Sequence, residues 1–226
     1  MKKTAHHTFT GTIVCLSGLR IGGSDDLLQT GGTDLTCIKH PVTLQPYIPG
    51  SSLKGRLRSE MEQREGKFSG RDENEPCACA RDECLICRVF GPHKAKSHKF
   101  GPSRLIVRDC PVTKGGETEL KTENVIDRKT GQAMHPRKVE RVVAGSEFGF
   151  KLALQVWDVD NLCKFRDDAG KDHTGPAALL EFLRCALRRV QRTGLGSGVS
   201  KGSGEIEFRN LKLHRDGAAQ PEDFPL

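Results

Sequence analysis

Residues 31–59 read "GGTDLTCIKHPVTLQPYIPGSSLKGRLRS", a loop followed by a proline-punctuated extended segment and the start of a helix. The glycine pair at 31–32 permits backbone conformations that other residues avoid, so this loop can approach a ligand closely. The loop carries a carboxylate, Asp34, and the polar segment before it offers Asp25 and Asp26 as alternatives. A lone loop aspartate is also a common turn former, and that interpretation stands beside a catalytic one.

The sequence from residue 51 onward predicts a basic helix over 51–65. Ser51 or Ser52 suits the N-cap position, and the apolar residues that follow recur at helical spacing. A helix start with free N–H groups, two hydroxyls and nearby cations favours an anion, and phosphate is the expected one. Glycine–serine turns also begin helices in every class of protein, so a purely structural role remains open. The candidate phosphate-binding residues are Ser51, Ser52, Lys54, Arg56 and Arg58.

The length and the net charge of the chain indicate how many domains it forms and what kind of partner it binds. The chain has 226 residues, enough for one domain with a substantial core, and its formal net charge is +7. Clustered cations gain affinity for phosphates by releasing counterions, so a polyanionic partner is expected; a basic protein without one is the alternative. The sequence contains no apolar run of about 18 residues and no signal-peptide core, which predicts a soluble, cytoplasmic protein with no membrane partner.

Four of the nine cysteines lie close together, with the spacing C-x-C-x4-C-x2-C. Four thiolates can surround Zn²⁺ as a tetrahedron, and a fully cysteine-ligated ion has no open position for water, so this zinc would be structural. His93 or His98 could replace one cysteine, or the thiols could be unligated. A secreted disulfide scaffold fits less well, because nine is odd and no export signal is present. The candidate ligands are Cys77, Cys79, Cys84 and Cys87.

The periodic segments predict an α+β fold in the order strand, helix, strand, strand, helix, strand. This is the ferredoxin-like (RRM-like) arrangement, here called the palm. We expect a single domain over 1–226, with insertions at 66–101 for the cysteines and at 111–147. Many unrelated proteins share this arrangement, so it does not indicate function. The predicted strands cover 8–19, 103–112, 148–156 and 205–213, and the second helix covers 175–194.

The stretch 113–146 is polar and long for a segment without a core of its own. Apolar residues in it, such as Ile126 and Met134, are flanked by cations. They could wedge between nucleic-acid bases while Arg128, Arg137 and Lys138 hold phosphates. A solvated basic loop is the alternative.

The glycine-rich loop "GLGSGVSKGSG" at 194–204 matches no nucleotide-binding template, since it follows a helix and precedes a strand. Its main chain is almost bare of side chains and includes Lys201, so it could lie against a nucleic-acid backbone.

Taken together, "GGTD…YIPGSSLKGRLRS", the pattern at 122–148 and the loop at 194–208 resemble the RAMP proteins, the repeated backbone subunits of type III CRISPR interference complexes. Within them, the chain is similar to the target-RNA-cleaving subunit of the Csm type. The family's thumb hairpin has the pattern found here as Glu123-Asn124-Val125-Ile126-Asp127-Arg128, Thr130, Ala133, Pro136-Arg137 and Glu140-Arg141-Val142. Lys201-Gly202-Ser203-Gly204 stands where the family usually has Arg-Gly-x-Gly, a departure that keeps the charge.

The resemblance implies a function and a set of partners. Asp34 falls at the position that serves target-RNA cleavage, which in relatives depends on Mg²⁺ or another divalent ion and uses the 2′-hydroxyl as nucleophile. The thumb would intercalate into the duplex of CRISPR RNA guide and target RNA. Expected partners are both RNAs, further copies of the chain in a filament, and other type III effector subunits. The RNA-binding candidates added by these motifs are Arg128, Arg137, Arg141 and Lys201.

Two other functions remain open. One is a non-catalytic RNA-binding scaffold with the same fold. The other is a guide-RNA-processing endonuclease of the same superfamily, which would need no metal and would use a histidine such as His6, His7 or His40.

Overall fold

A seven-stranded, mostly antiparallel sheet forms the centre of the structure, a computed structural model that describes residues 1–22, 35–67, 75–95, 98–99 and 101–226. The strand order is β11, β10, β1, β7, β4 and β2, and β3 also pairs with β7. The strands are β1 (Lys3–Cys15), β2 (Tyr47–Ile48), β3 (Leu105–Val107), β4 (Cys110–Lys114), β7 (Glu147–Trp157), β10 (Ile206–His214) and β11 (Glu222–Asp223).

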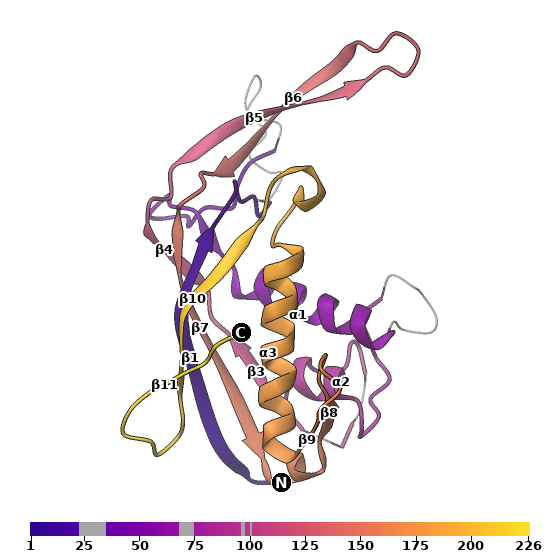
Figure 1. Cartoon of the computed structure of the whole chain (residues 1–226), viewed down its shortest axis with the longest axis vertical. Coiled ribbons are helices and arrows are strands. Elements are labelled where there is room, and N and C mark those ends of the chain that lie inside the picture. The colour runs from indigo at the N-terminus through magenta and orange to yellow at the C-terminus, as the bar shows by residue number, and fades with distance from the viewer. Residues whose placement is uncertain (23–34, 68–74, 96–97, 100) are drawn as a thin grey trace.

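The helices cover one face of this sheet, as Figure 1 shows. They are α1 (Gly50–Glu65), the short α2 (Leu85–Phe90) and α3 (Gly175–Thr193). The predicted apolar stripes of α1 and α3 are confirmed, except that Leu180 is only partly buried. The buried leucines each contribute about 1.5–3 kcal/mol, and they are Leu53, Leu57, Leu179, Leu183 and Leu187. The predicted inward face of β7 is confirmed as well: its buried residues include Phe148, Phe150, Leu152, Leu154 and Val156.

The first strand is shifted relative to the prediction of 8–19. It spans Lys3–Cys15, and Leu16 already lies outside the sheet with 44% of its surface exposed. Leu16 and Ser17 donate main-chain hydrogen bonds to Glu205 instead of continuing the ladder with β7. The strand therefore ends earlier than the apolar periodicity predicts, because the chain after Cys15 turns toward the start of β10.

The predicted strand over 103–112 is two strands, β3 and β4, and its interruption explains how α1 begins. Asp109 lies between these two strands, and its Oδ1 accepts a hydrogen bond of 2.7 Å from the main-chain N–H of Gly50. The N-cap residue is Pro49, so the predicted cap at Ser51 or Ser52 is wrong. A Cβ on Gly50 would lie 2.5 Å from the carbonyl oxygen of Val107, so only glycine permits this close approach.

A long two-stranded hairpin projects from the sheet (Figure 1). It consists of β5 (Thr118–Ile126) and β6 (Ala133–Val142) and is here called the thumb hairpin. At its tip, Asp127 closes the turn by accepting hydrogen bonds from the main-chain N of Lys129 and Thr130. A second hairpin, of β8 (Lys164–Arg166) and β9 (Asp172–Thr174), packs against α3 and has no counterpart in the prediction.

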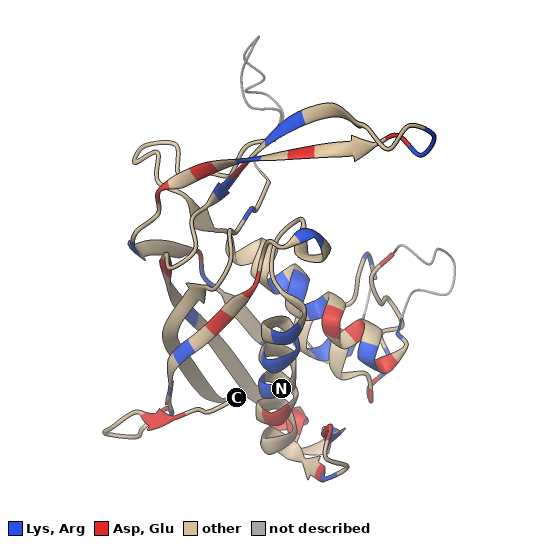
Figure 2. Ribbon diagram, turned by 45° about the horizontal axis from the view of Figure 1, so that its top comes forward, with Lys and Arg blue, Asp and Glu red and all other residues tan. Residues whose placement is uncertain are grey.

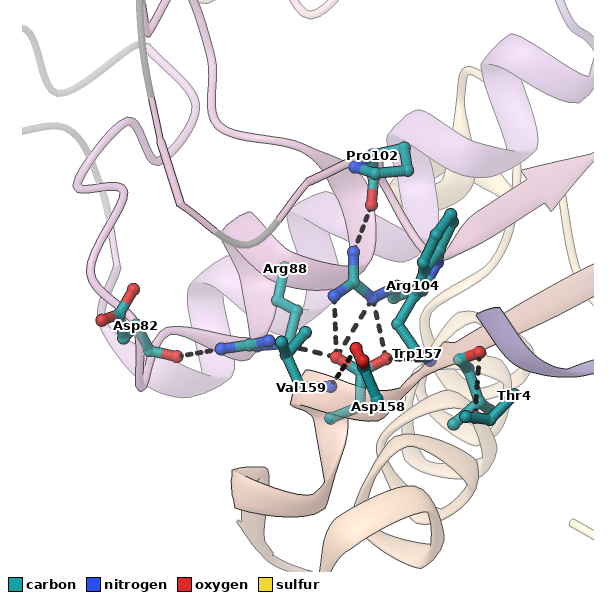
Figure 3. A network of polar contacts seen from close by, with 10 residues as sticks. Thr4, Asp82, Arg88, Pro102, Arg104, Trp157, Asp158 and Val159 are labelled. Carbon is teal, nitrogen blue, oxygen red and sulfur yellow. Dashed lines mark hydrogen bonds and ion pairs between the residues drawn. The ribbon is translucent and has the colours of Figure 1, made fainter. Parts of the chain in front are cut away.

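A buried charge cluster ties the cysteine-containing insertion to the palm (Figure 3). Asp160, fully buried in the 3-10 helix Asp158–Leu162, accepts hydrogen bonds from Arg88 of α2 at 3.0 Å and from Arg104, next to β3, at 2.8 Å. Its Oδ2 also accepts the main-chain N–H of Trp157 at 2.8 Å. Because every lone pair of a buried carboxylate needs a donor, these contacts fix the three elements relative to one another.

In the part of the chain that the structure describes, no helix is long and apolar enough to span a membrane.

Candidate nucleic-acid interface at the root of the thumb hairpin

The described residues on either side of the segment 23–34 pair with neighbouring chain close to where the thumb hairpin leaves the sheet. Gly22 pairs with Cys37, and the N–H of Ile38 donates to the carbonyl of Ile21 at 2.8 Å. Leu35 forms a parallel bridge with Val139 of β6. Asp34, its glycine pair at 31–32 and the alternatives Asp25 and Asp26 lie outside the described residues.

The glycine-rich loop 194–204 packs against the chain just before that segment. The N–H of Ser197 donates to the carbonyl of Arg20 at 2.8 Å, and the guanidinium of Arg20 donates back to the Ser197 hydroxyl at 2.9 Å. Gly196 has a φ of +78°, and a Cβ there would lie 2.3 Å from the Arg20 carbonyl oxygen. The glycine therefore serves a close chain-to-chain contact at this point.

Side chains of the thumb hairpin reach the same loop. Arg141 donates to Glu119 at 2.7 Å and to the Ser203 hydroxyl at 3.2 Å. Lys201 lies 3.8 Å from the carboxylate of Glu123. The structure thus brings together two RNA-binding candidates, Arg141 and Lys201, that are 60 positions apart in the sequence.

The outer half of the thumb hairpin combines exposed cations with exposed apolar side chains. Arg128 is exposed in the tip turn, and Arg137 is exposed beside Glu123, to which it donates at 2.9 Å. Figure 2 shows basic residues at this tip. The hydrogen bond from Arg137 lowers the pKa of Glu123, so this carboxylate is charged at neutral pH. The exposed apolar residues are Val125, Ile126 and Met134, with 60%, 46% and 41% of their surface accessible.

The basic side chains of α1 mostly form hydrogen bonds and ion pairs with other parts of the protein. Lys54 donates to the carbonyl of Leu105 at 3.0 Å, and burial lowers its pKa. Arg56 donates to the carbonyl of Gly194 at 2.9 Å and pairs with Glu60 at the same distance. Arg58 donates to a carboxylate and two carbonyls, those of Glu62, Gly91 and Cys77.

The predicted anion site at the helix start is therefore not open at Gly50, because the main-chain N–H of Gly50 already donates a hydrogen bond to Asp109. Ser51 is exposed and Ser52 is half-buried, and both hydroxyls are near the helix surface. Arg58 acts as a brace between α1 and the cysteine loop, because it binds the carbonyl of Cys77.

The four clustered cysteines form a group whose sulfur atoms lie within 4.8 Å of one another. The Sγ–Sγ distances are 3.9 Å for Cys77–Cys84, 3.8 Å for Cys79–Cys87 and 3.7 Å for Cys77–Cys87. A tetrahedron with Zn–S bonds of about 2.3 Å has S–S edges of about 3.8 Å, so these four sulfurs fit a structural zinc ion. His93 contacts this loop through its main-chain N–H, which donates to the Cys77 carbonyl.

Replacing Cys87 with serine is expected to reduce bound zinc from about one ion per chain to near none, because three remaining thiolates cannot close the tetrahedron. Metal analysis of the purified chain measures this. Cys110→Ala is the matched control, since Cys110 is equally buried but outside the cluster. Zinc retained at full occupancy by the Cys87 variant would mean that this residue is not a ligand.

Comparison with known proteins now identifies the family. The model of the RAMP superfamily matches residues 12–207. The chain belongs to the RAMP superfamily. Its curated RAMP relatives include the "CRISPR system Cms endoribonuclease Csm3" of Methanothermobacter thermautotrophicus, 36% identical over 94% of this chain and 87% of the relative. The proteins of the same name from Methanocaldococcus jannaschii and Streptococcus thermophilus are 35% and 33% identical over 90% of this chain, and over 78% and 87% of their own lengths.

Two solved RAMP structures share the fold. One is a Csm3–Csm4 subcomplex of the type III-A CRISPR-Cas interference complex, with a TM-score of 0.54, 23% identity, and coverage of 98% of this chain and 83% of that one. The other is the type III-B Cmr-beta complex bound to cognate target RNA, with a TM-score of 0.59, 17% identity, and coverage of 92% and 61%. The mixed α/β, mostly antiparallel architecture is therefore that of the RAMP family.

Sequence reasoning missed the residues that join these loops to the thumb hairpin. Arg20 was not singled out, and Glu140 appeared only as part of a family motif. Glu140 is 8% exposed although it is charged. The sequence offered one signal for Glu140, a charged residue close to the two apolar residues Val139 and Val142 in a predicted extended segment. A charge that is buried there needs hydrogen-bond partners from elsewhere in the chain.

Proposed function

We propose that this chain is the CRISPR RNA-binding backbone subunit of a type III effector complex and that it cleaves the complementary target RNA. Membership of the RAMP superfamily and relatives whose name is endoribonuclease Csm3 support this. The observation that carries the proposal is the anchoring of residues 22 and 35 at the root of the thumb hairpin. Asp34 directly precedes Leu35 in the sequence, so the chain that carries the candidate carboxylate continues into a residue that pairs with the thumb hairpin.

In the proposed reaction the 2′-hydroxyl of a target nucleotide attacks its own 3′-phosphate and expels the 5′-oxygen of the next nucleotide. The products are a 2′,3′-cyclic phosphate and a 5′-hydroxyl, which forms when the expelled 5′-oxygen takes up a proton from the solvent. Asp34 accepts the proton of the 2′-hydroxyl or helps to hold a divalent ion. That ion would supply electrostatic stabilisation of the phosphate charge. In-line attack requires a splayed backbone, and such positioning is itself a large contribution to the rate.

The exposed apolar side chains of the thumb hairpin are suited to displace a nucleotide, since apolar wedges can unstack neighbouring bases. Exposed cations beside them would hold the phosphates that flank the wedge. We propose structural roles for Lys54, Arg56 and Arg58, because these side chains bind other parts of the protein. The RNA-binding residues that we propose are Ser51, Ser52, Arg128, Arg137, Arg141 and Lys201.

We also propose that the chain is one ferredoxin-like domain over 1–226, with the insertions 66–101 and 111–147. The sequential order β1, α1, β3, β7, α3, β10 supports this classification. The chain would act in the cytoplasm of a prokaryotic cell, in contact with the guide, the target, copies of itself and other type III subunits. A zinc ion in the cysteine cluster would stabilise the insertion.

The proposal predicts cleavage of target RNA by the complex assembled on a guide, in Mg²⁺ but not in excess EDTA. A denaturing gel of end-labelled target measures this, and phosphatase-resistant ends identify the cyclic phosphate. Target RNA that is bound but intact in Mg²⁺ would favour the scaffold function. Cleavage of precursor hairpin RNA in EDTA by the chain alone would favour the guide-processing function.

A further inference from the structure

The side chain of Glu140 accepts three hydrogen bonds, all of them from other parts of the protein. Its Oε1 accepts hydrogen bonds from Lys39 Nζ at 2.6 Å and from the Thr118 hydroxyl at 2.8 Å. Its Oε2 accepts the main-chain N–H of Cys37 at 2.9 Å. Its own main-chain N–H donates to the carbonyl of Leu35 at 2.9 Å. We call this set of contacts the Glu140 clasp.

The clasp joins three pieces of chain that are distant in sequence. Lys39, Cys37 and Leu35 follow the segment 23–34, Thr118 begins β5, and Glu140 lies on β6. The thiol of Cys37 adds a further contact, donating to the Glu140 carbonyl at 3.2 Å. Both strands of the thumb hairpin are thus linked to the same five residues, 35–39.

The Glu140 carboxylate can hold these segments together because three hydrogen-bond donors contact it. Burial opposes its ionisation, but the hydrogen bonds from Lys39, Cys37 and Thr118 outweigh that effect and lower the pKa of Glu140. A glutamine of the same shape would turn an NH₂ group toward at least one of the donors. The neutral variant therefore loses at least one contact and gains a donor-to-donor conflict.

The next residue, Arg141, points to the opposite face of β6, as alternation along a strand requires. There it contacts Ser203 of the glycine-rich loop and Glu119 of β5. The adjacent pair 140–141 therefore fastens the thumb hairpin to a different loop on each side. On the Glu140 side that loop is the one that continues directly into Asp34.

We propose that Glu140 is a positioning residue for RNA cleavage. It holds residues 35–39 against β6 and so fixes the main chain that directly follows Asp34 in the sequence. This inference rests on the proposed function, because it requires Asp34 to serve the reaction. Glu140 itself makes no contact with RNA in this scheme and acts only through the clasp.

The test compares Glu140→Gln with the wild-type chain in the assembled guide-bound complex. The single-turnover rate constant for target cleavage should fall about 100-fold, the loss typical of a misplacement of about 1 Å in a reacting group. The dissociation constant for target RNA should change by less than about twofold, because the exposed cations of the thumb hairpin are untouched. Glu140→Asp should recover part of the rate, since it restores the charge with a shorter side chain.

Two further variants keep the test decisive if Glu140→Gln is unstable. Thr118→Val and Lys39→Met each remove one donor and should each give a smaller loss of rate with the same unchanged affinity. Glu222→Gln is the matched control, because it breaks an exposed ion pair with Arg215 at 2.6 Å in a strand outside the interface, and it should cleave at the wild-type rate.

The outcomes separate the two proposals. If Asp34→Ala abolishes cleavage while the clasp variants cleave at the wild-type rate, the positioning role is refuted and the proposed function stands. If the clasp variants lose rate and RNA affinity in equal measure, Glu140 maintains the fold only, which also refutes the inference. If Asp34→Ala cleaves at the wild-type rate, the assignment of Asp34 fails and this inference fails with it, whereas the proposed function fails only if the wild-type complex leaves bound target RNA intact.

Discussion

Asp34→Ala in the assembled complex is expected to lower the rate of target-RNA cleavage by at least about 100-fold and to leave guide and target binding nearly unchanged. A positioned general base contributes about 10²–10⁴-fold to the rate of a proton transfer, and loss of a ligand to the divalent ion would add to this. Binding depends on other residues, because the exposed cations of the thumb hairpin remain. Single-turnover cleavage of end-labelled target and filter binding measure the two quantities separately.

The matched controls for this variant are Asp25→Ala and Asp26→Ala, two carboxylates of the same segment. Both should cleave within a few-fold of the wild-type rate. If one of them abolishes cleavage while Asp34→Ala does not, the catalytic carboxylate has been assigned to the wrong residue of this loop. Asp34→Asn should behave like the alanine variant, since an amide cannot accept the proton at neutral pH.

Asp160→Ala is expected to destabilise the folded chain by about 3–5 kcal/mol, the range measured when one partner of a buried ion pair is removed. The variant leaves two guanidinium groups, those of Arg88 and Arg104, buried without their shared carboxylate. Both arginines keep main-chain carbonyl contacts, to Asp82 and Pro102, but these do not compensate a positive charge. Equilibrium unfolding in urea, monitored by circular dichroism, gives the free-energy difference.

Asp158→Ala is the control for that measurement. Asp158 lies two residues away with 46% of its side chain exposed, and its ion pair with the N-terminal amine is long, at 3.9 Å. Exposed ion pairs are weak because water screens the charges, so this variant should be much less destabilised than Asp160→Ala. Equal losses for the two variants would show that the 158–162 segment is sensitive to any substitution and that the buried cluster has no special role.

The elements that could be predicted from the sequence are those whose signal is local. The apolar alternation of β7 and the stripe of α3 each lie within one continuous segment, so their periodicity predicts both the element and its buried face. The cysteine cluster is local too, since its four ligands span residues 77–87. The start of α1 was predicted wrongly because the carboxylate that binds its first N–H, Asp109, lies between β3 and β4, 59 positions later in the sequence.

The intramolecular partners of the basic residues on α1 could not be predicted, for a related reason. Cations beside an apolar stripe are expected to face solvent, and the sequence does not reveal which other segments cover them. Arg58 is covered by the carbonyls of Gly91 and Cys77, and Arg56 by that of Gly194. For the same reason the role of Glu140 could not be predicted, because its partners, from Thr118 to Leu35, are 22 to 105 positions away in the sequence. Long-range polar contacts leave no periodic trace in the sequence.

In the part of the chain that the structure describes, the thumb hairpin contacts the neighbouring loops from its root as far as Glu123, and its outer part extends away from the palm (Figure 1). In mechanical terms it is a cantilever, and a load applied to the free end of a cantilever produces its greatest bending moment at the support. Residues 140 and 141 lie at that support. Any base pair that pushes on Val125 or Ile126 therefore exerts its largest torque on the side chains that hold the two neighbouring loops.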